Sequence, residues 1–290
     1  GKGLMGTPLV STVLAAELIR RAGGIAEEDV LEDISGGCAA TVAYLDGSDW
    51  GATNTGVSVD ANGVLSGSKF MVPDAAQATW IAVVGSDAAG DAVVALVAGR
   101  DVAAQAQASH ALIDLTKRAS TLDFTGVKAQ RVLSGDKVAS AIRDYLLIGA
   151  LLTAAEAVGS TSACLAGIVD YLKTRKQFGK LIGSFQALKH PPVDIYVGME
   201  HSRSLVYHAS SEIDDGPLSA EAEVACRMAK AKASDTIQYA GDRSVQFHGG
   251  FGFTWECDSS LFIRRAAWSQ QQFGDAMHHR KRLAPLLLDA

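Results

Sequence analysis

The chain has 290 residues, of which 48% are hydrophobic and 20% charged, and its mean hydropathy is +0.14. This composition excludes an intrinsically disordered chain, a collagen-like chain and a small disulfide scaffold, and the length suffices for two or three domains. The net charge of −6 and the pI near 5.6 argue against a nucleic-acid binder. The acidic surplus lies in residues 1–135, which carry 9 basic and 15 acidic side chains, whereas residues 136–290 carry 17 of each.

The chain also lacks the usual signs of a membrane, a leader or a metal. No apolar run reaches the roughly 18 residues that cross a bilayer, so no membrane partner is expected. No basic segment leads into an apolar stretch near residue 1, so no signal peptide is expected. The four cysteines form no CxxC pair and no zinc spacing with histidine. They are Cys38, Cys164, Cys226 and Cys257. We expect free, packed thiols, no metal site, and a reducing, cytoplasmic location.

The first third of the chain combines helical and strand patterns. Residues 8–23 place apolar side chains at helical spacing and end at Gly23-Gly24, and residues 26–35 predict a short helix with an acidic first turn. From Cys38 to about Val132, short apolar runs alternate with turn signals such as Asp46-Gly47 and Asn62-Gly63. This spacing predicts an antiparallel β-sandwich or barrel. The runs cover 38–45, 63–72, 79–85, 91–99 and 120–133.

From Lys137 onward the pattern is helical to the end. Asp144 to Lys173 is one long apolar stretch rich in small residues, which at 1.5 Å per residue spans roughly 45 Å. Small residues allow close helix approach, so this segment is predicted to be a central helix of a bundle. Further helices are predicted over 186–214, 218–248 and 259–272. Pro191 and Pro192 are expected near the start of the first of these, where a missing N–H costs least.

A first motif follows the long helix, over Thr174–Gln186 (TRKQFGKLIGSFQ). The Arg175 guanidinium suits a bidentate grip on a phosphate. Phe178, Ile182 and Phe185 are suited to line an apolar slot for a flat ring. The alternative is structural: a basic helix end that complements the helix dipole and stops at a glycine.

A second motif covers Gln246–Thr254 (QFHGGFGFT). It is not the GxGxxG of a Rossmann fold, because a helix and not a strand leads into it. Its three glycines allow backbone N–H groups to approach an anion closely. The alternative is a tight turn between helices that needs positive φ.

The two motifs stand in order, about 70 residues apart, with Arg264-Arg265-Ala266 downstream. Together they resemble the acyl-CoA dehydrogenase family over essentially the whole chain, most strongly over 171–273. The resemblance implies an α+β multi-domain fold: an N-terminal helical domain, a middle antiparallel β-barrel or sandwich and a C-terminal four-helix bundle. The implied domains are a truncated remnant of the helical domain at 1–36, the β-domain at 37–133 and the bundle at 134–290.

The family binds FAD at a subunit interface and removes hydrogens from Cα and Cβ of an acyl-CoA thioester. The resemblance implies that the ADP part of FAD is held by the two motifs of the neighbouring subunit. The implied cofactor-binding residues are Arg175, Gln177, Phe178, Ile182, Phe185, Gln246, Gly249 and Gly250.

The segments that hold the flavin ring in the family depart from its pattern here. Gly47-Ser48-Asp49 is retained, but the preceding Thr-Glu-Pro element is absent. The family's Trp-Ile-Thr falls on Phe70-Met71-Val72, and Val72 cannot donate a hydrogen bond to a flavin.

The position of the catalytic base departs as well. The family's usual Glu falls on Phe273, before Gly274, and the position used by a minority of members falls on Gly149, followed by Ala150 in place of an Arg. None of these side chains can abstract an α-proton, so no catalytic residue is assigned. Asp275 is the nearest carboxylate, either as a displaced base or, structurally, as a helix N-cap or a solvated loop residue.

Three other polar features have structural interpretations. Glu156 lies in the middle of an apolar helix, where a buried carboxylate needs a partner. An interhelical ion pair or hydrogen bond is the favoured role over a displaced catalytic one. Residues 278–282 (HHRKR) are expected to form a solvated helix face, or alternatively to contact a partner subunit. His190 is expected to cap or pack.

The family residues that are missing here are those that contact the flavin ring and the substrate, whereas the residues that contact the ADP part of FAD are retained. The favoured hypothesis is therefore a hetero-oligomer in which a sister subunit supplies the flavin pocket, most acyl-CoA contacts and the catalytic Glu. The chain resembles the non-catalytic (β) subunit of an actinobacterial α2β2 acyl-CoA dehydrogenase of the steroid side-chain type, which implies an electron-transfer flavoprotein as electron acceptor. The alternatives are a self-sufficient dehydrogenase with a displaced base and a cofactor-free scaffold subunit.

Overall fold

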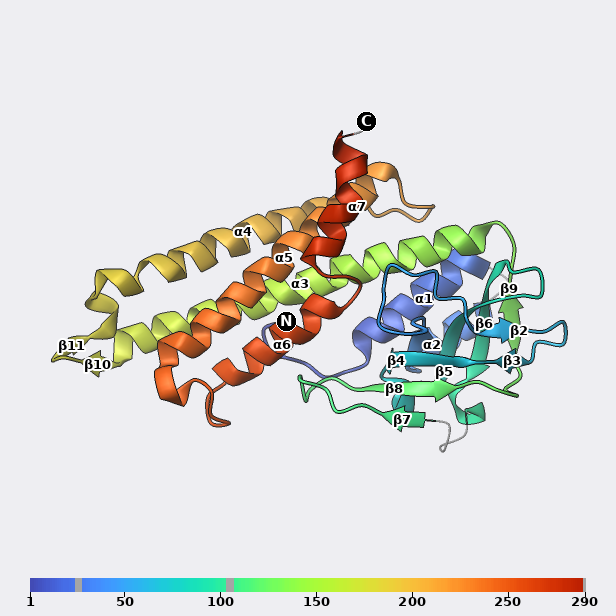
Figure 1. The fold of residues 1–290 in the computed structure, drawn as a ribbon, viewed down its shortest axis with the longest axis horizontal. Coiled ribbons are helices and arrows are strands. Elements are labelled where there is room, and N and C mark those ends of the chain that lie inside the picture. The colour runs from blue at the N-terminus through green and yellow to red at the C-terminus, as the bar shows by residue number, and fades with distance from the viewer. Residues whose placement is uncertain (24–27, 103–106, 289–290) are drawn as a thin grey trace. The chain divides into compact units, whose positions relative to one another are not determined.

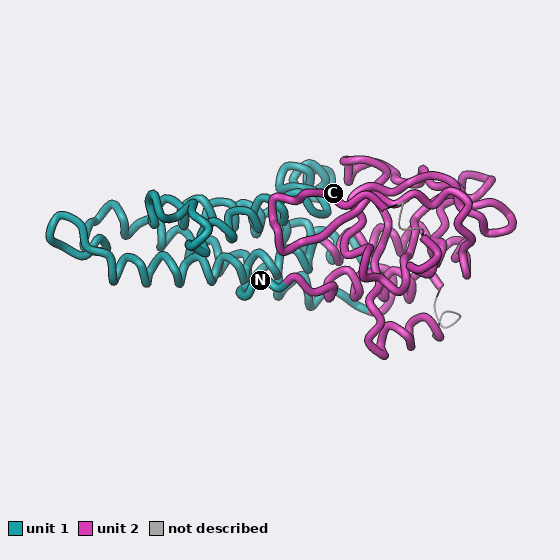
Figure 2. The backbone as a smooth tube through the Cα atoms, turned by 90° about the horizontal axis from the view of Figure 1, so that it is seen from below, with its two compact units in different colours: residues 1–5, 150–214, 218–290 teal, residues 6–149, 215–217 magenta. Residues whose placement is uncertain are grey.

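The computed structural model describes residues 1–23, 28–102 and 107–288 (Figure 1). The described chain divides into two compact units, coloured separately in Figure 2. One unit comprises 6–149 with 215–217 and holds the strands of the predicted β-domain. The other comprises 1–5, 150–214 and 218–290 and is helical. The predicted order of helical segment, β-domain and helical bundle is confirmed.

Two helices precede the strands. Helix α1 (Leu9–Gly23) buries Leu14, Leu18 and Ile19, the apolar positions that the helical spacing placed on one face. Helix α2 (Glu28–Ser35) follows. Gly24 and the predicted first residues of α2, 26–27, lie outside the described residues.

Within the described residues, the β-domain has nine short strands in two sheets (Figure 1). They are β1 (Ala40–Ala43), β2 (Ser58–Val59), β3 (Leu65–Ser66), β4 (Ser68–Pro73), β5 (Trp80–Ser86), β6 (Ala92–Ala98), β7 (Gln107–Ser109), β8 (Ala119–Asp123) and β9 (Arg131–Leu133). The larger sheet has the order β3-β2-β5-β6-β9 with β1 also on β5, and the smaller has the order β4-β8-β7. Both sheets contribute to one core, for example through Ile81, Val97 and Leu122, as a sandwich requires.

Two strand pairs depart from the antiparallel pattern. β1 runs parallel to β5, with Ala40 opposite Trp80, and β2 also joins β5 in parallel. A parallel pair needs a long connection, and the chain from β1 to β5 supplies it by passing through β2, β3 and β4.

Glycine turns divide two of the predicted apolar runs between the sheets. The run 63–72 becomes β3 and β4, which separate at Gly67 (φ +123°). A Cβ at Gly67 would lie 3.1 Å from the Gly56 carbonyl oxygen and 3.3 Å from Val57 Cα, so the crossing has room for glycine alone. The run 120–133 likewise becomes β8 and β9, in different sheets.

The helical unit is built from five helices and the short turns that connect them. The helices are α3 (Lys137–Thr174), whose first part to Gly149 groups with the β-domain, α4 (His190–Ser211), α5 (Ala220–His248), α6 (Ser259–Gln271) and α7 (Ala276–Leu288). α5 packs against α4, α6 and α7. The predicted helices are confirmed, except that 182–188 forms two 3-10 turns, η5 (Ile182–Ser184) and η6 (Gln186–Leu188), before α4. Pro191 and Pro192 occupy the first turn of α4, as expected.

Small residues bring these helices into close contact. A Cβ at Gly241 of α5 would lie 3.0 Å from Ile263 Cα of α6, and one at Gly198 of α4 would lie 3.0 Å from Thr236 Cγ2 of α5. The glycines thus set the spacing of α5 from both neighbours.

Within the described residues, α3 is long and apolar enough to cross a membrane by length and composition, contrary to the expectation that no run suffices. The expectation was wrong because an apolar stretch can include a single charged residue and still be long enough. Here Glu156 is the one charged residue between Tyr145 and Cys164. Of the apolar stretch in α3, 61% is buried inside the protein, as in a core helix.

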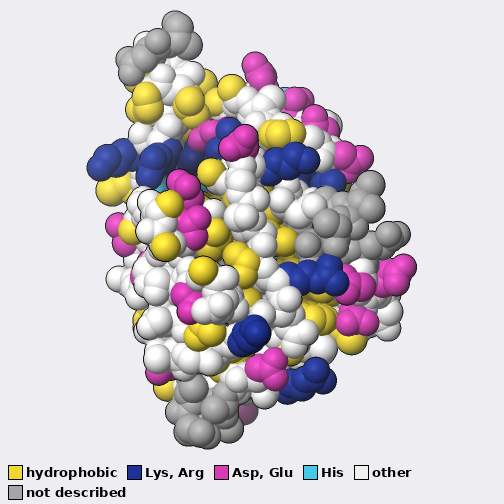
Figure 3. Space-filling model, turned by 90° about the vertical axis from the view of Figure 1, so that its right-hand side faces the viewer, with side chains coloured by type: hydrophobic (Ala, Val, Ile, Leu, Met, Phe, Trp, Pro, Cys, Tyr) yellow, Lys and Arg dark blue, Asp and Glu magenta, His cyan; other side chains and the backbone are white. Residues whose placement is uncertain are grey.

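Charges of both signs are interspersed on the face shown in Figure 3, with apolar side chains between them. The acidic surplus of residues 1–135 therefore forms no single-sign field on this face.

Helix α6 ends on a buried lysine from α5. The Lys230 ammonium donates to Ser234 Oγ at 2.9 Å and to the carbonyl oxygens of Ser269 and Gln270 at 3.1 and 3.3 Å. Those carbonyls belong to the last turn of α6, so Lys230 satisfies them and complements the helix dipole. Burial lowers the pKa of Lys230 to about 7, and the Asp275 charge opposes this shift.

We expect Lys230→Met to remove a pH dependence of stability. Because the folded-state pKa of Lys230 lies below that of an unfolded lysine, the unfolded chain binds more protons between about pH 7 and 10. The wild-type free energy of unfolding should therefore rise with pH in this window, relative to Lys230→Met, by roughly 1 kcal/mol per pH unit. Urea unfolding of both proteins at several pH values measures the difference. If the free energies of unfolding of the two proteins differ by the same amount at every pH, the lowered pKa of Lys230 is contradicted.

Candidate functional site

All eight residues predicted to bind the cofactor line one cavity of about 1050 Å³ at the end of the helical unit where α3 and α5 terminate. The cavity is enclosed by the first motif, the start of α4, the end of α5 and the 3-10 turn η7 (Gly249–Phe251). The lining residues beyond the predicted eight are Tyr171, Ala187, Leu188, Pro191, Arg243, Phe247, His248 and Phe251. Two segments about 70 residues apart in sequence thus form a single site.

The first motif forms a β-hairpin with an aromatic tip. Strands β10 (Lys176–Gln177) and β11 (Lys180–Leu181) pair, and the two residues between them, Phe178 and Gly179, have φ of +51° and +73°. Positive φ at both central residues is the requirement of a type I′ turn, which favours Asn and Gly and not a bulky side chain. The ring of Phe178 is 88% exposed and meets Phe185 edge-on at 6.2 Å. A strained, exposed aromatic residue indicates a function outside the fold of this chain.

The second motif contains three glycines with different physical requirements. Gly249 ends α5 with φ +61°, and a Cβ at Gly252 would lie 2.4 Å from the Val245 carbonyl oxygen. The fold therefore needs glycine at both positions. Gly250 has no positive φ, and a Cβ there would meet nothing within 4 Å. Because Gly250 lines the cavity and the fold leaves its side open, this position suits close approach of a ligand to the backbone.

His248 is a cavity residue to which the sequence analysis gave no role. Its Nδ1 lies 2.7 Å from the Ser244 carbonyl oxygen and 2.9 Å from Ser259 Oγ, and its ring lies on Tyr171 with centroids 4.4 Å apart. A carbonyl at this distance requires the proton on Nδ1, so in the neutral ring Nε2 is an acceptor. The histidine before Gly249-Gly250 was the available signal, but its orientation depends on α3 and α6.

Two arginines lie at the cavity. Arg175 is exposed and has no ion-pair partner among the residues that the structure describes. Arg243 is bound to Asp242, with Nε to Oδ2 at 3.0 Å, and its guanidinium lies 5.6 Å from the centroid of the Tyr239 ring. The hydrogen bond that Arg243 donates to Asp242 raises the pKa of Arg243. Arg175 is therefore the arginine available to an anion.

Glu156 forms the interhelical ion pair that the sequence predicted. Its carboxylate on α3 accepts a hydrogen bond from Arg265 of α6, and the Arg265 side chain is fully buried. The pairing excludes solvent from the arginine and gives the carboxylate a structural role. Arg264, beside it, places its guanidinium 4.7 Å from the ring centroid of Trp255.

Phe273, which the sequence analysis aligned with the family's catalytic Glu, lies in a left-handed turn with Gly274, at φ +57° and +92°. Asp275 accepts a hydrogen bond from the backbone N–H of His278 at 2.7 Å and caps α7, as in its structural interpretation. His279 behind it is buried, and burial with the nearby Lys230 charge lowers its pKa to about 3. Gly149 and Ala150, at the alternative position, are buried in α3.

The β-domain segments that hold a flavin ring in the family are bonded to each other here. The Phe70 N–H donates to the Leu45 carbonyl at 2.7 Å. Lys69, fully buried, donates to the carbonyls of Tyr44 at 2.9 Å and Asn54 at 2.7 Å and to Asp46 Oδ1 at 2.6 Å. Burial lowers the pKa of Lys69, and Asp46 opposes that shift.

The neighbouring flavin-side position Val72 has no donor on its side chain. Val72 is buried, and the strand has a bulge between Lys69 and Val72 with Met71 at φ +53°. The sequence analysis assigned no role to Lys69, because a lysine in an alternating strand is expected to face solvent.

Known proteins resemble this chain in sequence and in fold. The family described as "Acyl-CoA dehydrogenase, C-terminal domain" matches residues 139–285. The acyl-CoA dehydrogenase IpdE2 of Mycolicibacterium smegmatis is 38% identical over 134 residues, which are 46% of this chain and 40% of that protein. The chain spans about 40% of the length of the curated relatives that it matches.

Solved structures share the fold. Butyryl-CoA dehydrogenase from Megasphaera elsdenii superposes with a TM-score of 0.85 at 23% identity, over 97% of this chain and 76% of that one. The ChsE4-ChsE5 complex from Mycobacterium tuberculosis superposes with a TM-score of 0.83 at 25% identity, over 98% of this chain and 77% of that one. Since the family match covers half of the sequence and includes both motifs, the chain belongs to the acyl-CoA dehydrogenase family.

Proposed function

We propose that the chain is a subunit of a heteromeric, FAD-dependent acyl-CoA dehydrogenase that binds the ADP part of FAD for a partner subunit. The partner supplies the flavin pocket, most of the acyl-CoA contacts and the catalytic Glu. The observation that carries the proposal is an asymmetry. The cavity at the end of α3 and α5 keeps every predicted nucleotide contact, whereas both positions for a catalytic base carry side chains without a carboxylate.

The residues of the cavity fit the ADP part chemically. Arg175 offers an unpaired guanidinium for a diphosphate, and Gly250 leaves the backbone open to a close anion. Phe178 and Phe185 offer apolar ring faces and edges for adenine. Gln177 and Gln246 add amide donors and acceptors. Each of these groups lies at the rim or wall, so a second chain is needed to enclose the rest of the cofactor.

The β-domain supports the other half of the proposal. Lys69 donates three hydrogen bonds, to Tyr44, Asn54 and Asp46. These bonds hold together the two segments that would otherwise flank a flavin ring. Opening them would leave a buried ammonium unpaired, which is costly. We therefore infer that this chain's own β-domain holds no isoalloxazine.

Bound in such a site, FAD would supply the hydride acceptor for the dehydrogenation of an acyl thioester. The residues of this chain act on the nucleotide end. Arg175 neutralises diphosphate charge, the hairpin covers the site from water, and His248 presents a fixed acceptor. Such contacts hold the cofactor in place and leave the proton transfers to the partner.

The partner and substrate are extensions of the same proposal. Solved relatives include a complex named ChsE4-ChsE5 and a protein titled "Tcur3481-Tcur3483 steroid ACAD G363A variant". We propose an α2β2 assembly, an acyl-CoA whose acyl group is a steroid side chain, and an electron-transfer flavoprotein as the electron acceptor. The free thiols support a cytoplasmic enzyme.

The first prediction concerns flavin content. The chain purified alone should be colourless, and co-purification with a sister subunit that retains the catalytic Glu should give a yellow, active complex, because each cofactor needs residues from both chains. Absorbance at the flavin bands and turnover with an acyl-CoA measure this. A chain that is yellow and active alone would instead support a self-sufficient dehydrogenase.

The second prediction concerns Arg175→Ala in the complex. Loss of a charge-assisted hydrogen bond to the diphosphate should weaken FAD retention by about ten- to hundredfold, since such bonds contribute roughly 1.5–3 kcal/mol. The matched control is Arg203→Ala, which removes an arginine paired with Glu200 on α4, outside the cavity. Equal FAD retention in both variants would favour a cofactor-free scaffold.

The third prediction concerns His248→Leu in the complex. The variant keeps the bulk beside Tyr171 but loses the fixed Nε2 acceptor, so calorimetry should show about two- to tenfold weaker ADP binding. The control is His208→Leu, which changes an exposed histidine of α4 that does not line the cavity. ADP affinity that is equal in both variants would remove His248 from the site.

A further inference from the structure

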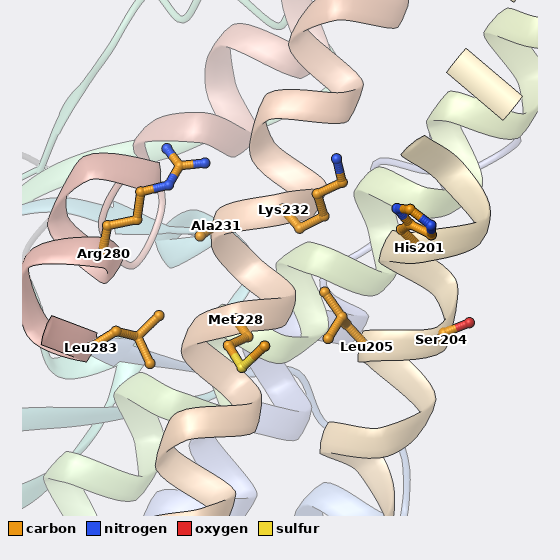
Figure 4. Close-up of a pocket in the computed structure, with 8 residues that line it drawn as sticks. All are labelled: His201, Ser204, Leu205, Met228, Ala231, Lys232, Arg280 and Leu283. Atoms are coloured by element: carbon orange, nitrogen blue, oxygen red, sulfur yellow. The ribbon is translucent and has the colours of Figure 1, made fainter. Parts of the chain in front are cut away.

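A second groove lies on the helical unit, between α4, α5 and α7 (Figure 4). Its volume is about 480 Å³, and none of its lining residues belongs to the nucleotide cavity or to the family motifs. The lining residues are His201, Ser204 and Leu205 of α4, Met228, Ala231 and Lys232 of α5, and Arg280 and Leu283 of α7.

The lining side chains form two rows, one basic and one apolar (Figure 4). Each helix supplies one residue to each row, three or four positions apart, so the pair lies on one helix face. The basic row is Arg280, Lys232 and His201, and the apolar row is Leu283, Met228 and Leu205. The rows therefore run side by side across three helices.

The charge of the basic row is only partly compensated within the chain. Arg280 pairs with Asp235 of α5, and both side chains are about half exposed. Within the described residues, Lys232 and His201 have no acidic partner for their side chains. A surface that aligns uncompensated donors in this way attracts an anion.

The apolar row exposes surface beside these donors. Met228 remains 38% exposed at the centre of the row, while Leu283 and Ala231 form a buried floor. Covering such surface releases about 25 cal/mol for each Å² removed from water. A ligand that satisfies both rows must carry an apolar body and an anionic group along one edge.

We propose that this groove binds a small amphipathic carboxylate, with its carboxylate on Lys232 and His201 and its apolar body on Met228, Leu205 and Leu283. The groove is of the size of small-molecule sites. A neutral apolar compound would leave the basic row unpaired, and a polyanion such as a nucleotide would leave the apolar row exposed. The site is independent of the nucleotide cavity and of the proposed function.

Calorimetry with decanoate as the probe tests the proposal, on the purified full chain and on its assembled complex. Decanoate should bind both, more tightly than decanol and acetate, and more weakly as salt is added. Lys232→Gln and Met228→Gln should each weaken binding about two- to fivefold. The control Lys281→Gln, a lysine on α7 that does not line the groove, should leave it unchanged.

Three results would overturn the proposal. Equal affinity for decanol and decanoate would reduce the groove to an apolar surface. Equal affinity in Lys232→Gln and Lys281→Gln would remove the basic row from the site. Binding that disappears when the complex assembles would make the groove a subunit contact.

Discussion

The ion pair between Glu156 of α3 and Arg265 of α6 joins two helices of the unit that carries the nucleotide cavity. α6 is joined to α5 by residues 249–258, which include the glycine motif, and the pair holds α6 against α3, whose end carries the hairpin motif. Because the Arg265 side chain is fully buried, the Glu156 carboxylate compensates a charge that solvent does not reach. The charge pair thus connects helices that flank the two motifs, at a point outside both of them.

Much of the architecture could be predicted from local patterns, because helix periodicity, capping and glycine turns are local. The helices, the first-turn prolines of α4 and the pairing of Glu156 followed from spacing and from the cost of burying a charge. The strand runs were predicted, but Gly67 sends one run to two sheets, and only the approach of Val57 makes that glycine necessary. Sequence spacing contains no information on such contacts.

The site divides in the same way. The eight predicted residues each belong to a continuous motif, whereas Tyr171 and Arg243 lie outside both motifs and join the cavity through the packing of α3 and α5. Lys69 and Lys230 were missed because a lysine is expected at the surface, and both are buried only where several carbonyl oxygens converge. The hydrogen bonds of Lys69 join the β-domain segments that the sequence analysis aligned with the flavin-side segments of the family. Together they give a physical reason for the one-sided chemistry that we propose.

The hairpin tip has a consequence for the cell. Phe178 holds a backbone conformation that costs of order 1–3 kcal/mol and presents a bare phenyl ring to water. In the proposed assembly the partner subunit covers that ring. A subunit made in excess would keep the ring exposed and would be prone to aggregation or degradation. Matched synthesis of the two chains, from one transcript for instance, would then be a matter of solubility as much as of stoichiometry.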